Sequence, residues 1–99
     1  MNVRIRPSAE DDLADGFAFY ENQQAGLGSY FLDCLSADLD SLALYGGIHR
    51  RVFDAHRALS RTFPFAIYYD VIEDTAHVKA VLDCRRDPKW IQKKLRETR

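Results

Sequence analysis

The sequence predicts an α+β fold, in which a hairpin of two helices packs on one face of a mainly antiparallel sheet in the order β-α-α-β-β-β-α. Apolar residues repeat at helical spacing through the first half of the chain, and the period changes to two from residue 51 onward. Asp87-Pro88 then signals a last helix. Ninety-nine residues suffice for one core, so we expect a single domain over residues 1–99.

The chain begins with a short strand followed by an acidic helix. Val3 and Ile5 alternate with polar residues over positions 2–6, and Pro7 ends the strand because it supplies no ladder donor. We expect Ser8 to cap the helix, whose first turn carries three carboxylates near the positive end of the helix dipole. The apolar stripe of this helix comprises Leu13, Phe17 and Tyr20.

A second helix follows a break at Ala25-Gly26-Leu27-Gly28. Gly26 suits the left-handed conformation that ends a helix. Another stripe at helical spacing then runs until Gly46-Gly47 and comprises Phe31, Leu35, Leu39 and Leu42. The two stripes predict a helical hairpin with a shared apolar side.

Period-two patterns predict three further strands, over residues 51–56, 63–72 and 75–84. Glu73-Asp74 separates the last two, which indicates an antiparallel hairpin. Apolar residues occupy both faces of the middle strand, so we expect it to be central. Asp87 should cap the final helix, with Pro88 at its first position and Trp90, Ile91 and Leu95 as anchors.

Charge is unevenly distributed although the net charge is −1. Residues 1–48 carry two basic and eight acidic side chains, and residues 49–99 carry twelve basic and seven acidic ones. A basic region suits a nucleic acid or an acidic protein, while attraction between the two halves or simple solvation is the other interpretation.

Other function classes find no support in the sequence. No apolar run approaches the roughly 20 residues of a membrane span, and no secretory signal is visible, so we expect a cytoplasmic protein without membrane contact. Cys34 and Cys84 lack metal-ligand spacing. We therefore expect reduced thiols, no metal and no cofactor.

Five motifs occur in an order that carries a family resemblance. They are Ala9-Glu-Asp-Asp-Leu13, Tyr20-Glu21, Gly26-Leu-Gly28 with Phe31 and Leu35, Arg61-Thr-Phe-Pro-Phe65-Ala-Ile-Tyr68-Tyr69, and Arg85-Arg86-Asp87-Pro88 with Trp90. Together they resemble the ParE/RelE superfamily, the toxins of bacterial type II toxin–antitoxin modules that act in growth inhibition and plasmid stabilisation. The resemblance implies a RelE/ParE-like fold, a cognate antitoxin and a toxin–antitoxin hetero-oligomer.

The superfamily implies two activities, and two departures bear on the choice between them. Relatives like RelE cut messenger RNA on the ribosome, and typically present an arginine three residues before a tyrosine; here Phe65 precedes Tyr68. They usually carry a histidine or tyrosine near the end of the last strand, where this chain offers Arg85, Arg86 and Trp90. Neither guanidinium nor indole gives up a proton near neutral pH. The sequence therefore favours the branch like ParE, which inhibits DNA gyrase by binding.

Candidate site residues follow from this preference. We expect Arg61, Arg85 and Arg86 to contact the target because guanidinium groups fork onto carboxylates and phosphates, with Lys89 and Lys93 adding attraction at long range. Pairing with neighbouring carboxylates or solvation is the alternative role of these cations.

Two further sets of candidate residues remain, one for catalysis and one for antitoxin binding. In the alternative of a RelE-like mRNA endoribonuclease, His56 would act as the base while Arg61 or Arg85 holds the phosphate. For the antitoxin, the resemblance implies a flexible segment that wraps the toxin in apolar grooves. The rings expected to line such a groove are Tyr20, Tyr30, Phe31 and Tyr45.

Overall fold

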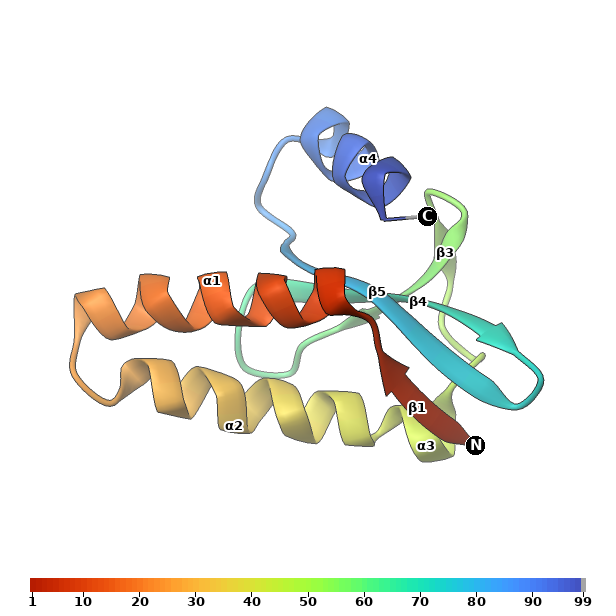
Figure 1. Ribbon diagram of the computed structural model, residues 1–99, viewed down its shortest axis with the longest axis horizontal. Coiled ribbons are helices and arrows are strands. Elements are labelled where there is room, and N and C mark those ends of the chain that lie inside the picture. The colour runs from red at the N-terminus through yellow and green to blue at the C-terminus, as the bar shows by residue number, and fades with distance from the viewer. Residues whose placement is uncertain (99) are drawn as a thin grey trace.

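The computed structural model describes residues 1–98 and contains a five-stranded sheet with helices on both faces (Figure 1). The elements in chain order are β1 (Asn2–Ile5), α1 (Pro7–Gln23), α2 (Leu27–Asp40), α3 (Leu42–Tyr45), β2 (Arg51–Val52), β3 (Ala55–Leu59), β4 (Phe65–Ile72), β5 (Thr75–Asp83) and α4 (Pro88–Glu97). The predicted α+β class and element order are confirmed, with α3 and β2 as short additions.

Strand β4 is central, as predicted, in a sheet of order β1-β5-β4-β3-β2. β1 pairs in parallel with β5, and all other neighbours are antiparallel. The β4–β5 hairpin turns at Glu73 and Asp74, whose φ angles of 49° and 59° give the left-handed turn that matches strand twist. The predicted hairpin is therefore confirmed.

The predicted strand over residues 51–56 is wrong, because the chain reverses within it. Phe53 and Asp54 have φ angles of 55° and 63°, and they form the turn between β2 and β3. Phenylalanine rarely adopts a left-handed conformation, so its presence did not signal a turn. β3 then continues to Leu59 and pairs with β4.

The two predicted caps had different outcomes. Arg6 occupies the N-cap position of α1 without a side-chain bond, and Ser8 Oγ donates instead to the distant Lys79 carbonyl at 2.7 Å. The Ser8 cap was therefore a wrong prediction. Asp87 caps α4 as expected, since its carboxylate accepts from the Lys89 backbone N–H at 2.9 Å.

The connection and the end of the helical hairpin also differ from expectation. Gly26 is left-handed, with φ of 90°, but it precedes α2 rather than ending α1, which is followed by Gln24 as its C-cap. The second stripe is interrupted at Ser41, after which Leu42 begins α3. Leu42 is nevertheless fully buried, so the apolar stripe continues across the break.

Two apolar cores lie on opposite faces of the sheet. On one face of the sheet, the hairpin face, the helices α1 and α2 run side by side (Figure 1). On the other face, the α4 face, α4 packs against the sheet. Large side chains fill the first core, including Tyr20, Phe31, Leu35, Phe65, Ile67, Tyr69, Val78 and Val81. The second core is smaller and comprises Ala55, Ala66, Tyr68, Ala80, Leu82, Ile91 and Leu95.

Helix α1 also closes the edge of β5 beyond the reach of β1. β1 pairs with β5 from Thr75 to Val78. Past that point, Ser8 binds the Lys79 carbonyl, and the Asp12 carboxylate accepts from the Val81 backbone N–H at 3.0 Å. Burial raises the pKa of Asp12 from 3.8 to about 6. Covering a strand edge in this way prevents unwanted pairing with other chains.

Candidate functional site

The turn between β5 and α4 holds Arg85 in a fixed orientation. Asp83 Oδ1 accepts from the Arg85 backbone N–H at 2.8 Å and from its Nε at 3.0 Å, while Oδ2 accepts from the guanidinium at 2.7 Å. Hydrogen bonding to Arg85 lowers the pKa of Asp83. The Arg85 side chain is still 62% exposed. It is therefore oriented by its neighbour and accessible to a partner.

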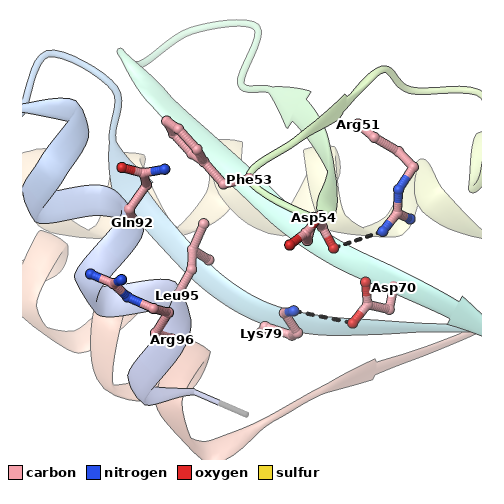
Figure 2. Close-up of a pocket in the computed structure, with 8 residues that line it drawn as sticks. All are labelled: Arg51, Phe53, Asp54, Asp70, Lys79, Gln92, Leu95 and Arg96. Atoms are coloured by element: carbon pink, nitrogen blue, oxygen red, sulfur yellow. Dashed lines mark hydrogen bonds and ion pairs between the residues drawn. The ribbon is translucent and has the colours of Figure 1, made fainter.

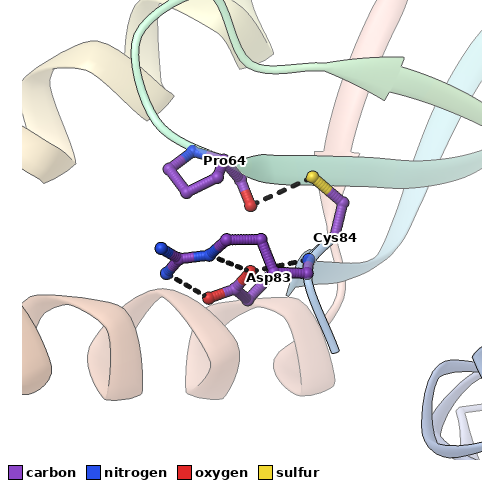
Figure 3. A network of polar contacts seen from close by, with 4 residues as sticks. Pro64, Asp83 and Cys84 are labelled. Atoms are coloured by element: carbon purple, nitrogen blue, oxygen red, sulfur yellow. Dashed lines mark hydrogen bonds and ion pairs between the residues drawn. The ribbon is translucent and has the colours of Figure 1, made fainter. Parts of the chain in front are cut away.

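The same turn is joined to the segment that carries Arg61. The Cys84 thiol donates to the Pro64 carbonyl at 3.1 Å (Figure 3). The Cys84 backbone N–H donates to the same carbonyl at 2.9 Å. That segment is anchored in turn by Ser60 Oγ, which donates to the buried Asp38 carboxylate at 2.6 Å. The structure thus places the Arg61 loop and the Arg85–Arg86 turn at the same end of the sheet.

Arg86 stacks on the last helix. Its guanidinium carbon lies 3.9 Å from the centre of the Trp90 ring, and Lys94 Nζ lies 5.8 Å from the same ring. Such cation–π contacts orient a charge without neutralising it. The three side chains line a cleft of about 250 Å³ together with Asp12 and Asp15 of α1.

All five cations predicted to contact a target are exposed. Lys89 and Lys93 lie on the outer surface of α4, and neither forms an ion pair within residues 1–98. Arg85 alone among the five is paired, with Asp83. The site missed by sequence reasoning is the Arg86–Trp90 stack, although their spacing across a helix start was a usable signal.

The alternative catalytic residues are not brought together. His56 Nδ1 donates to the His49 carbonyl at 2.7 Å, and its ring stacks on Tyr69 at 5.1 Å. His56 pairs with Tyr69 across the sheet, whereas Asp83, which holds Arg85, pairs with Phe65. Four strand residues, roughly 13 Å, separate these positions. His56 and Asp83 therefore lie at different positions along the sheet.

Phe65 occupies the position at which the resemblance to RNA-cutting toxins would place a guanidinium. Its ring is buried on the hairpin face, 5.0 Å from that of Phe31. Arg57 does pair with Tyr68 on the α4 face, but the adjacent His56 points to the opposite face because strand neighbours alternate. Burial also raises the pKa of Tyr68. The His56 imidazole therefore lies on the opposite face from Arg57.

The four rings predicted to bind an antitoxin divide into two pairs. Phe31 is fully buried and Tyr20 nearly so, and both belong to the core. Tyr30 and Tyr45 are 52% and 55% exposed. Phe19, which sequence reasoning did not single out, presents a further exposed ring beside Tyr20.

The described residues contain neither a metal-binding cluster nor a membrane-spanning helix. Among the described residues, no three histidine, cysteine or carboxylate side chains gather as a metal would require. Cys34 and Cys84 are free thiols. No helix in residues 1–98 has the length and apolar character to cross a membrane.

Comparison with known proteins identifies the architecture. No protein-family model matches the chain, and no curated protein matches its sequence. A solved structure titled "Chromosomal ParDE TA system from P. aeruginosa" is similar, with a TM-score of 0.69 and 12% sequence identity over 82% of this chain and 92% of that chain. At this identity the match establishes the fold, and the predicted RelE/ParE-like architecture is confirmed.

Proposed function

We propose that this protein is the toxin of a bacterial type II toxin–antitoxin module, that it inhibits DNA gyrase by binding, and that a cognate antitoxin neutralises it. The fold shared with a chain of a ParDE system supports the toxin assignment. The observation that carries the choice of mechanism is Phe65, a core ring at the position where a nuclease needs a cation. Binding requires no cofactor and no metal.

The cations at the end of the sheet supply the binding chemistry. Asp83 holds Arg85 and Trp90 supports Arg86, so both guanidinium groups lose little conformational freedom when a partner arrives. Guanidinium groups form strong, directional hydrogen bonds with carboxylates. The proposed target surface is therefore acidic, and the exposed lysines of α4 would accelerate its approach.

A RelE-like ribosome-dependent mRNA endoribonuclease is the second candidate. The pairing of Arg57 with Tyr68 favours it, because a cation and a phenol then share the α4 face. Against it stands the raised pKa of Tyr68, which leaves this phenol a poor base near neutral pH. The separation of His56 from Arg85 also leaves the phosphate without a neighbouring imidazole.

Loss of the two turn arginines tests the proposed binding site. The double variant Arg85→Ala with Arg86→Ala should abolish growth arrest at wild-type expression, while its circular dichroism and thermal melting remain close to those of the native protein. Arg4→Ala with Arg50→Ala is the matched control, since it removes two exposed cations elsewhere and should leave arrest unchanged. If the turn variant still arrests growth, the proposed site is wrong.

A second experiment separates the two candidate activities. Primer extension on messenger RNA and an SOS reporter are followed in the same culture after induction. Intact transcripts with SOS induction would support gyrase as the target. Transcripts cut at codons, without SOS induction, would establish the endoribonuclease instead.

A further inference from the structure

A polar hollow of about 530 Å³ lies between the β2–β3 turn, the sheet and α4 (Figure 2). It is lined by Arg51, Phe53, Asp54, Asp70, Lys79, Gln92, Leu95 and Arg96. None of these residues belongs to the Arg85–Arg86 turn or to the cleft beside Trp90. Its volume lies within the range of small-molecule sites, which is roughly 300–1,000 Å³.

The floor of the hollow is a buried lysine positioned by an irregularity in the sheet. Tyr68 pairs with Ala80 and Tyr69 with Val78, so Lys79 is an extra residue in β5. Bulges of this kind redirect a side chain. Lys79 is only 8% exposed, and its Nζ lies 3.1 Å from Asp70 Oδ2. An ammonium group has three donors, and this carboxylate oxygen takes one of them.

Two arginines stand on opposite sides of the hollow (Figure 2). Arg51 of β2 donates one guanidinium N–H to the Asp54 backbone carbonyl at 2.7 Å. Arg96 of α4 forms no ion pair within the described part of the chain. The hollow is thus lined by three cations and two carboxylates, and Lys79 is already paired with one carboxylate, that of Asp70. The charge that remains unmatched is positive.

We propose that this hollow binds a small organic phosphate. Lys79, Arg51 and Arg96 would contact the phosphate, since ammonium and guanidinium donors both suit its oxygens. Phe53 and Leu95 supply apolar surface for the organic part, and Gln92 adds an amide for hydrogen bonding. A metal cation would meet three positive side chains here. The β2–β3 turn and α4 bound the hollow on two sides, which favours a small molecule over a nucleic-acid strand.

Calorimetric titration of the full chain tests this site, which is independent of the proposed function. The probes are adenosine monophosphate, pyrophosphate and unphosphorylated adenosine. Both phosphates should bind with one-to-one stoichiometry, and adenosine should not. Arg51→Gln and Arg96→Gln should each weaken binding about tenfold or more, because each removes a charge-assisted hydrogen bond.

Matched controls distinguish a site from general positive charge. Arg50→Gln and Lys93→Gln alter exposed neighbours outside the hollow and should change the Kd less than about twofold, since exposed charges contribute little. Equal weakening by lining and control variants would overturn the proposal. So would the absence of saturable phosphate binding, binding of adenosine as tight as that of the monophosphate, or binding of a single-stranded oligonucleotide alone.

Discussion

The two faces of the sheet are built from different side chains. The hairpin face is closed by large rings such as Tyr20, Phe31 and Tyr69. The α4 face has small residues at Ala55 and Ala80, and it includes two hollows at the borders of α4. It also carries the ion pair between the buried Lys79 and the partly exposed Asp70. The difference indicates that one face provides most of the stability and the other presents charge. A binding surface on the α4 side can then change without loss of the core.

The largest expected effect is a loss of stability on truncation of a core side chain, which should differ between the two faces of the sheet. Phe31→Ala empties a fully buried site in the larger core and should lower the free energy of unfolding by about 3–5 kcal/mol. Leu95→Ala on α4 should cost nearer 2 kcal/mol, roughly the lower limit for such substitutions, because the smaller core can relax. Denaturant titration of both variants measures the difference. Equal losses would contradict the proposed division of stability.

The next largest expected effect is the pH dependence of stability that arises from Asp12, which lies between α1 and β5. Its folded pKa of about 6 exceeds 3.8, so between these values the folded chain holds a proton that the unfolded chain has released. Stability therefore falls as pH rises through this window. The loss is smaller than the roughly 3 kcal/mol that the full shift would give at about 1.4 kcal/mol per pKa unit, because the carboxyl is partly exposed and solvent screens its charge.

Asp12→Asn removes this titration and should be more stable than the native protein at pH 7. The advantage should disappear below pH 3.8, where the aspartate is protonated in both states. Unfolding measured across pH 3 to 8 would test this. A variant less stable than the native protein at pH 7 would show that the charged carboxylate is needed at Val81.

Asp83→Asn should weaken growth arrest less than removal of the two arginines. The variant keeps an acceptor for the Arg85 backbone but loses the charged fork that orients the guanidinium. Because the folded pKa of Asp83 is lowered, its stabilising contribution is present above 3.8 and is lost as pH falls through the folded pKa. Arrest equal to that of the native protein would show that orientation of Arg85 is unimportant.

The smallest effect is expected at His56. His56→Gln keeps a side-chain donor near the His49 carbonyl and should leave growth arrest unchanged, because binding needs no base. Growth curves at matched expression provide the measurement. A folded His56→Gln protein that no longer arrests growth would instead support the endoribonuclease.

Local sequence patterns were sufficient to predict much of the fold. The helical hairpin, the β4–β5 turn and the Asp87 cap depend on residues close in sequence, and all were predicted. The β2–β3 turn was missed because Phe53 is left-handed without a sequence signal. The Ser8–Lys79 bond was missed because it spans 71 positions.

The candidate site was less predictable than the fold for the same reason. Arg85, Arg86 and Lys89 lie around the start of α4 and are exposed, as their place in the sequence suggested. Their contact with a target stays a prediction. The burial of Phe31 could not be distinguished from groove lining by spacing alone. Lys79 was overlooked because a bulge, set by pairing between strands, turns it toward Asp70.

Inhibition of gyrase by binding, without catalysis, can be measured with purified components. DNA supercoiling by gyrase is measured with increasing amounts of this protein, and ribosomes programmed with messenger RNA are treated in parallel. We expect dose-dependent loss of supercoiling, absent in the Arg85→Ala, Arg86→Ala variant, with the messenger RNA intact. Unaffected gyrase together with cut messenger RNA would contradict this expectation.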